Sequence, residues 1–232
     1  MSLEKKTARI AGALFIVGTV AGLLSIAPSI DAPDYLTKAS ENETQVLIGA
    51  FFQFLMAAAY IGFAILLYPI LKRYNESLAI GFLGFRLMAG VFNIIGVIIV
   101  LLLLTLSQEF LKAGASASSY FQVTGELLRA ARDYVNHVAM ILAQSLGGIM
   151  YFYIFYQARL VPRWLSVWGI AGATLAILAS FLVMFHLIGV ITPIYIVLNL
   201  PIALQEMVLA VWLIAKGLNS TAVAFETSKT VY

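Results

Sequence analysis

The chain has 232 residues, of which 62% are hydrophobic and only 11% are charged, and its formal net charge is +3. Soluble domains carry about 25% charged residues, so this composition excludes a soluble globular protein and is typical of a polytopic membrane protein. The absence of cysteine excludes disulfides, thiolate metal sites and cysteine nucleophiles. Because the basic residues flank apolar stretches instead of forming a patch, we expect no nucleic-acid partner.

Six apolar stretches are close to or longer than the roughly 20 residues that a helix needs to cross a bilayer. We therefore predict an all-α, polytopic membrane bundle of six transmembrane helices, with the lipid bilayer as its main partner. The predicted spans are about 10–30, 45–71, 78–106, 134–157, 164–188 and 194–215. The first span follows basic residues as a signal peptide does, but its apolar run exceeds the usual length of about 7–15 residues, so we expect a spanning helix.

The distribution of basic residues predicts the orientation of the bundle. With the N-terminus inside, nine of the 14 Lys and Arg residues fall in inner segments and four in outer segments. The positive-inside rule then places both termini in the cytoplasm of a multi-pass cell-membrane protein. Residues 1–218 are expected to form a single domain, and 219–232 a polar cytoplasmic tail.

The two longer outer connections differ in their patterns. Residues 31–44 are predicted to form a short acidic loop, and 107–133 a longer connection. The second half of the longer connection, TGELLRAARDYVNH, has a helical pattern with Thr124 as its cap. We therefore expect the fourth helix to project outward before it enters the membrane.

Two opposite charges lie deep within the predicted spans. Arg86 is about 12 Å from the cytoplasmic start of the third span, and Glu206 is about 14 Å from the cytoplasmic end of the sixth, at the helical rise of about 1.5 Å per residue. A charge at membrane depth is costly, so it is usually paired, faces the protein interior and marks a functional or architectural feature. We predict that these two residues form an ion pair.

Two asparagines repeat this arrangement one level further out. Asn93 lies seven residues after Arg86, and Asn199 lies seven residues before Glu206. Since seven residues are close to two helical turns, each pair shares one helix face. If the third and sixth spans pack together, the charges and the amides form two polar levels at matching heights.

Other polar residues fall at similar depths in the remaining spans. Gln144 is predicted near the asparagine level, Tyr60 near the charged level, and Gln53 seven residues above Tyr60. Asp133 and His137 are spaced i,i+4, so the carboxylate is predicted to orient the imidazole. These nine residues are the candidates for a polar pocket that opens outward among spans two, three, four and six.

The motifs favour no specific chemistry. Gly18 and Gly22 form a small-xxx-small pattern, for which we favour packing within the bundle over dimerisation. Dense metal-ligand spacings and nucleophile motifs are absent from the sequence, so we expect no metal, no cofactor and no catalytic residues, although an intramembrane enzyme stays a third alternative. The leading hypothesis is binding or permeation of a small polar or amphiphilic ligand. Its rival is a non-catalytic accessory subunit of a membrane complex, whose buried charges only fasten helices.

Four stretches resemble a bacterial and archaeal membrane family known as "domain of unknown function 4386". They are RIAGALFIVG, YPILKRYNESLAIGFLGFR, RLVPRWLSVWGIAG and PIALQEMVLAVWLIAKG. The last contains an E-x5-W-L-I-x-K-G ending with Glu206, Trp212 and Lys216. The resemblance implies six helices and a prokaryotic plasma membrane, and it implies no activity. Members often have an acid soon after the span-three arginine, where this chain has Met88 and Ala89.

Overall fold

The computed structural model describes residues 3–114 and 118–219, and within these ranges the chain is all-α. Six helices of this described part are long and apolar enough to cross a membrane, which confirms the six predicted apolar helices and is consistent with a six-span membrane bundle. They are α1 (Leu3–Leu24), α4 (Glu43–Leu71), α5 (Glu76–Lys112), the continuous helix formed by α6 (Ser118–Tyr134), η1 (Val135–Ala139) and α7 (Met140–Ala158), then α8 (Arg163–Met184) and α9 (Pro193–Ala215).

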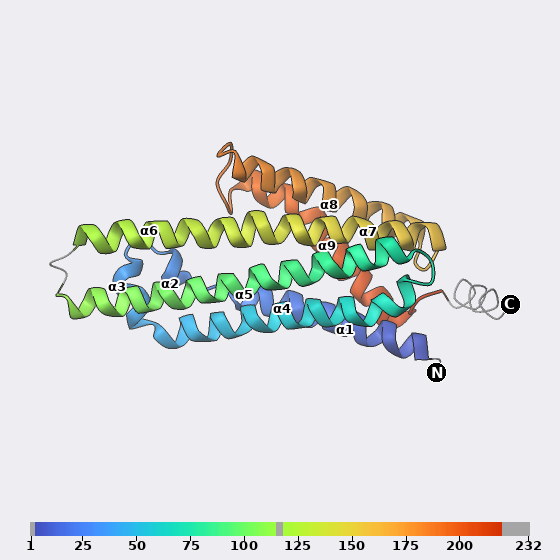
Figure 1. Cartoon of the computed structure of the whole chain (residues 1–232), viewed down its shortest axis with the longest axis horizontal. Coiled ribbons are helices and arrows are strands. Elements are labelled where there is room, and N and C mark those ends of the chain that lie inside the picture. Colours follow the sequence, from blue (N-terminus) through green and yellow to red (C-terminus); the bar gives the residue numbers. More distant parts are fainter. Residues whose placement is uncertain (1–2, 115–117, 220–232) are drawn as a thin grey trace.

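The long helices form a closed ring in the order α1, α4, α5, α7, α8, α9 and back to α1. In this ring α5 and α9 lie opposite each other, with two helices between them on either side. The side-by-side packing of the third and sixth spans, which was the condition for two polar levels, is therefore not found. Since α1 begins and α9 ends at the same end of the bundle, we call that end proximal and the other end distal (Figure 1).

Several helix ends differ from the predicted spans. The first helix ends at Leu24 instead of residue 30, because Pro28 lacks an amide hydrogen and its ring would clash with the carbonyl four residues earlier. The fifth span ends at Met184 instead of 188, and His186 adopts a left-handed φ of 57° just after it. In the opposite direction, α5 continues to Lys112.

The distal ends of α5 and α6 project together beyond the rest of the bundle (Figure 1). The fourth long helix thus begins well before its predicted span, at Ser118, and extends the bundle at its distal end. The predicted loop at 31–44 is wrong, because this region holds the end of α2 (Pro28–Asp31), all of α3 (Tyr35–Glu41) and the start of α4. Apolar residues on α3 face the projecting helices and form a separate distal core. Its buried members are Ala27, Ile30, Tyr35, Leu36, Ala39, Val46, Ala50, Ile99, Val100, Leu103 and Leu104.

Polar contacts fasten α6 to these short helices. Asp31 forms an ion pair with Arg132, and its carbonyl accepts a hydrogen bond of 3.1 Å from Arg129. The Arg129 guanidinium lies 4.8 Å from the ring centroid of Tyr35, and the Tyr35 ring fits against Gly125. Burial raises the pKa of Tyr35, so its hydroxyl stays protonated at neutral pH.

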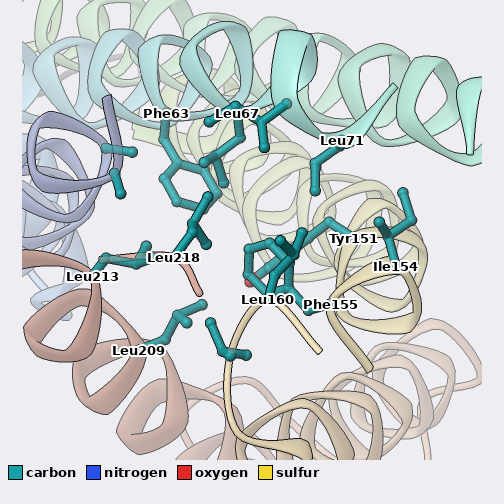
Figure 2. Close-up of a cluster of buried hydrophobic side chains, with 14 of the residues drawn as sticks. Phe63, Leu67, Leu71, Tyr151, Ile154, Phe155, Leu160, Leu209, Leu213 and Leu218 are labelled. Carbon is teal, nitrogen blue, oxygen red and sulfur yellow. The ribbon is translucent and has the colours of Figure 1, made fainter. Parts of the chain in front are cut away.

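The proximal half of the ring is filled by large apolar side chains (Figure 2). Phe63 and Leu67 of α4 meet Tyr151 of α7 there, and Leu213 of α9 closes the same core. Each of these four side chains is fully buried. The axis of the ring is therefore occupied by protein between its centre and the proximal end.

Candidate functional site

Arg86 of α5 and Glu206 of α9 meet at the centre of the ring. The Arg86 Nη2 atom lies 3.6 Å from Glu206 Oε1, and the two side chains are 1% and 10% exposed. The helical register thus predicted the correct heights. The contact runs across the ring instead of along a packed helix pair, because the long arginine side chain reaches the axis.

Four aromatic rings surround the Arg86 guanidinium. Its Cζ atom is 5.6–5.8 Å from the ring centroids of Phe15 on α1, Tyr60 and Phe63 on α4, and Tyr151 on α7. A cation within about 6 Å of a ring face is attracted by the ring quadrupole. Within the described part of the chain, the three guanidinium nitrogens have no hydrogen-bond partner. The positive charge is therefore stabilised by one carboxylate and by ring faces.

Three of these rings were not among the residues singled out from the sequence. Only Tyr60 was a candidate, because a phenylalanine in an apolar span has the same pattern as ordinary core. One signal was available: Tyr60 and Phe63 are spaced i,i+3 and so share a helix face. Two aromatic residues on one helix face predict contact with a buried arginine, provided that the helix carrying the arginine is known to pack against that face.

The position of Tyr60 is fixed by α1. Its hydroxyl lies 3.2 Å from the Thr19 Oγ1 atom, and its ring lies over Gly18, where an added Cβ would be 2.8 Å from the ring. Gly22 makes similar room for Met56. The Gly18-xxx-Gly22 pattern therefore packs α1 against α4, which confirms packing within the bundle.

A cavity of about 220 Å³ lies beside the ion pair, and Glu206 forms part of its wall. Its walls come from α4, α7, α8 and α9. The sequence predicted a pocket among spans two, three, four and six, so α8 takes the place expected for α5. Of the nine candidates, Tyr60, Gln144, Asn199 and Glu206 line this cavity.

The second predicted polar level is not formed. Asn199 donates a hydrogen bond of 2.9 Å to the Tyr195 carbonyl of its own helix. The Asn93 backbone carbonyl accepts a bond of 3.2 Å from Gln53, and the Asn93 Oδ1 atom is buried without a partner among the described residues. Asparagine is too short to reach across the ring from α5 to α9, so Asn93 and Asn199 do not form a level that joins these two helices.

Gln53 instead contacts a residue that sequence reasoning missed. Its Nε2 atom donates to Asn136 Oδ1 over 3.1 Å, which joins α4 to η1. Asn136 lay within the predicted fourth span, and an amide inside a span is itself a signal of an interhelical hydrogen bond. To identify Gln53 as the partner of Asn136, one would have needed to know how far the fourth helix is shifted along its axis relative to α4.

Asp133 does not orient His137. Asp133 forms an ion pair of 3.0 Å with Arg132, whereas the His137 Nδ1 atom lies 2.7 Å from the Tyr195 hydroxyl. The physical reason is the π-helical turn η1, whose wider turn removes the i,i+4 alignment of an α-helix. Within the described residues, no group of three or more His, Cys, Asp or Glu side chains gathers as metal ligands would.

The comparisons with known proteins concern the family alone. The family described as "Domain of unknown function (DUF4386)" matches residues 10–217, from within α1 to just beyond α9. Neither a curated protein nor a solved structure matches the chain. The matched residues include the ion pair, the cavity beside it, all of α4, α5, α7, α8 and α9, and α1 from residue 10 onward.

Proposed function

The chain belongs to the DUF4386 family of integral membrane proteins, and we propose that it binds a small amphiphilic ligand in the cavity beside Arg86 and Glu206. One observation carries this proposal. The cavity wall combines the carboxylate of Glu206 with apolar side chains in the middle of helices that are long and apolar enough to cross a membrane. Ionisable residues within such helices mark binding or transport sites when they face a cavity.

The lining indicates the chemistry of the ligand. Glu206 accepts hydrogen bonds or a positive charge, and Gln144 and Asn199 add amide groups nearby. Met56 and Ile202 supply apolar surface in the same wall. The cavity is smaller than the pockets of roughly 300–1,000 Å³ that hold drug-sized ligands. A small apolar molecule with an ammonium or hydroxyl group, or the head of a longer amphiphile, suits this lining.

Binding is better supported than permeation. The proximal half of the ring axis is filled by fully buried residues such as Phe63, Tyr151 and Leu213. A permeant would have to displace this core, whereas a bound ligand needs only the cavity. Permeation therefore requires a second conformation of the ring.

A second candidate function is that of an accessory subunit, in which the ion pair only fastens helices. The observation that favours it is the enclosure of Arg86 by four aromatic rings, which leaves 1% of its side chain exposed. Arg86 also does not line the cavity. In this function the cavity binds no ligand, so an added ligand would not protect a cysteine in its wall from a thiol reagent.

The two functions predict different reactivity of a cysteine in the cavity wall toward a small thiol reagent. The chain has no cysteine, so single substitutions report cleanly. We expect Ser145→Cys, in the cavity wall, to react with a small membrane-permeant thiol reagent and to be protected by millimolar octylamine. Ser166→Cys is the matched control, because Ser166 is fully buried and lines no cavity described for the chain. Equal reaction of both variants, or no protection of Ser145→Cys, would support the accessory function.

For the orientation, we propose that the proximal end with both termini faces the cytoplasm of the cell membrane. The basic residues at that end support it under the positive-inside rule. Lys112 ends α5 at the distal end of the bundle, and Lys72 follows α4 at the proximal end, so cysteines at these two positions report on opposite ends. In intact cells an impermeant reagent should label Lys112→Cys and spare Lys72→Cys, and the reverse pattern would invert the proposal. Residues 220–232 of the proposed cytoplasmic tail lie outside the described residues.

A further inference from the structure

A second cavity, of about 410 Å³, lies at the proximal end of the bundle, away from the ion pair. One wall is the connection between α7 and α8, from Arg159 to Arg163. The other wall is the end of α9 and the residues that follow it, from Lys216 to Asn219, together with Trp212. It is larger than the central cavity, and the proposed function does not use it.

Three cationic side chains line this cavity: Arg159, Arg163 and Lys216. All three are exposed, and none takes part in an ion pair formed within residues 3–114 and 118–219. The Arg163 guanidinium lies 4.9 Å from the ring centroid of Tyr156, which holds it at the rim. None of the described residues that line the cavity is acidic. Its electrostatic potential is therefore positive and attracts anions.

The start of α8 strengthens this potential. The helix begins at Arg163 after Pro162, and no side chain caps it. The first amide groups of a helix carry partial positive charge and bind anions readily. Of the two residues at the helix start that line the cavity, Pro162 has no amide hydrogen, so the Arg163 amide is the one that lies at the wall. The helix end and the three cations thus all add positive electrostatic potential to the same cavity.

Hydrogen bonds hold the two walls together. The Asn219 amide donates to the Leu160 carbonyl over 2.9 Å, and its side chain donates to the Arg159 carbonyl over 3.3 Å. Arg159 itself has a left-handed φ of 53°, a conformation that favours glycine at the end of a helix. Arg159 thus occupies a position where a non-glycine residue strains the backbone.

The aromatic residues around the cavity indicate its level relative to the bilayer. Trp212 lines it, and Trp164, which follows the lining residue Arg163, stacks on Trp168 with ring centroids 6.2 Å apart. Tryptophan and tyrosine gather at the level of the lipid headgroups. Basic pockets between transmembrane helices at that level bind anionic headgroups. We infer that the proximal cavity binds a phosphate anion presented by the headgroup of an anionic phospholipid.

The inference is tested with the full chain in a neutral detergent. Thermal unfolding is followed as dioleoylphosphatidylglycerol, dioleoylphosphatidylcholine or sodium phosphate is added. We expect the anionic lipid alone to raise the unfolding temperature. Because each basic residue near a membrane surface contributes about 1 kcal/mol, a factor of about five, the double variant Arg163→Gln/Lys216→Gln should bind about 25-fold more weakly. Lys72→Gln is the matched control, since Lys72 is exposed at the same end but lines no cavity described for the chain.

Three outcomes would overturn the inference. Equal stabilisation by phosphatidylcholine would show that charge is not recognised. Equal stabilisation by sodium phosphate would assign the site to a free anion. An equal loss in Lys72→Gln would indicate diffuse surface charge. If the double variant does not fold, Arg159→Gly provides an independent check, because glycine adopts the left-handed conformation without strain, and about a fivefold loss is expected.

Discussion

The charged and amide levels of the bundle have the same spacing on α5 and α9 but opposite structures. Arg86 and Glu206 meet at 3.6 Å on the ring axis, and four aromatic rings enclose the arginine. Two turns further toward the distal end, Asn93 and Asn199 each bond elsewhere. The difference shows that a shared register fixes the heights of two residues, whereas side-chain length decides whether they meet across a ring.

Each level also joins different helices. The charged level connects all of α1, α4, α5, α7 and α9 through one guanidinium. The amide level connects α4 to α5 and η1 through Gln53, and leaves Asn199 at the cavity wall. Stability should therefore depend strongly on the charged level and weakly on the amide level. The following variants test this contrast.

The largest effect is expected for Glu206→Gln, which leaves the buried Arg86 without its counter-ion. Breaking one partner of a buried pair costs about 3–5 kcal/mol. Arg86→Met/Glu206→Gln should cost less than the sum of the single variants, because no uncompensated charge remains. The measurement is thermal unfolding in detergent, with the exposed Glu41→Gln as control. Additive losses would mean that the pair contributes no coupling.

A smaller effect is expected where α4, α5 and η1 approach most closely. The variant is Gly96→Ala. Its added Cβ would collide with Gln53 Nε2 and Asn136 Oδ1, and so separate the two amides. Overpacking of this kind costs about 1–3 kcal/mol. Gly84→Ala is the matched control on the same helix, since an added Cβ meets nothing within 4 Å. It should be neutral or stabilising by about 0.5–1 kcal/mol through helix propensity. Similar unfolding temperatures for the two variants would contradict the close approach.

The contribution of the aromatic rings to Arg86 is isolated by two phenylalanines of the same core. Phe63 lies over the guanidinium, whereas Phe82 is equally buried and is not among the four rings. Both leucine variants lose a fully buried ring, and Phe63 has one more aromatic neighbour, Phe15, so their difference reports the cation–π attraction together with that ring contact. We expect Phe63→Leu to be less stable than Phe82→Leu by about 0.5–2 kcal/mol in thermal unfolding. No difference would leave Glu206 as the sole partner of the charge.

The sequence was informative about what lies within one helix and uninformative about what lies between helices. Apolar length predicted six helices, and helical rise placed Arg86 and Glu206 at matching heights. The order of helices around the ring has no periodic signal in the sequence, so α8 was not expected in the cavity wall. The π-helical turn η1 also has no such signal, and it separates Asp133 from His137.

The distal end illustrates the same limit in another form. The segment at 31–44 carries enough acidic residues to resemble a loop, yet Tyr35, Leu36 and Ala39 lie on one face of α3. That face has a partner only because α5 continues to Lys112 and α6 projects beside it. A short helix with three apolar residues is recognisable once its partner is known.

The smallest effect is expected for Asn93→Leu. The Asn93 Oδ1 atom is buried without a partner among the described residues, and its bond to Gln53 uses the backbone carbonyl, which leucine retains. Because the side chain loses no interhelical bond to α9, we expect a change of less than about 1 kcal/mol in the free energy of unfolding. Gln53→Leu, which removes two hydrogen bonds at the same level, should cost about 1–3 kcal/mol. Thiol access to Ser145→Cys should also be unchanged, since α5 does not line the central cavity. A large loss of stability in Asn93→Leu would show that the amide level fastens the ring after all.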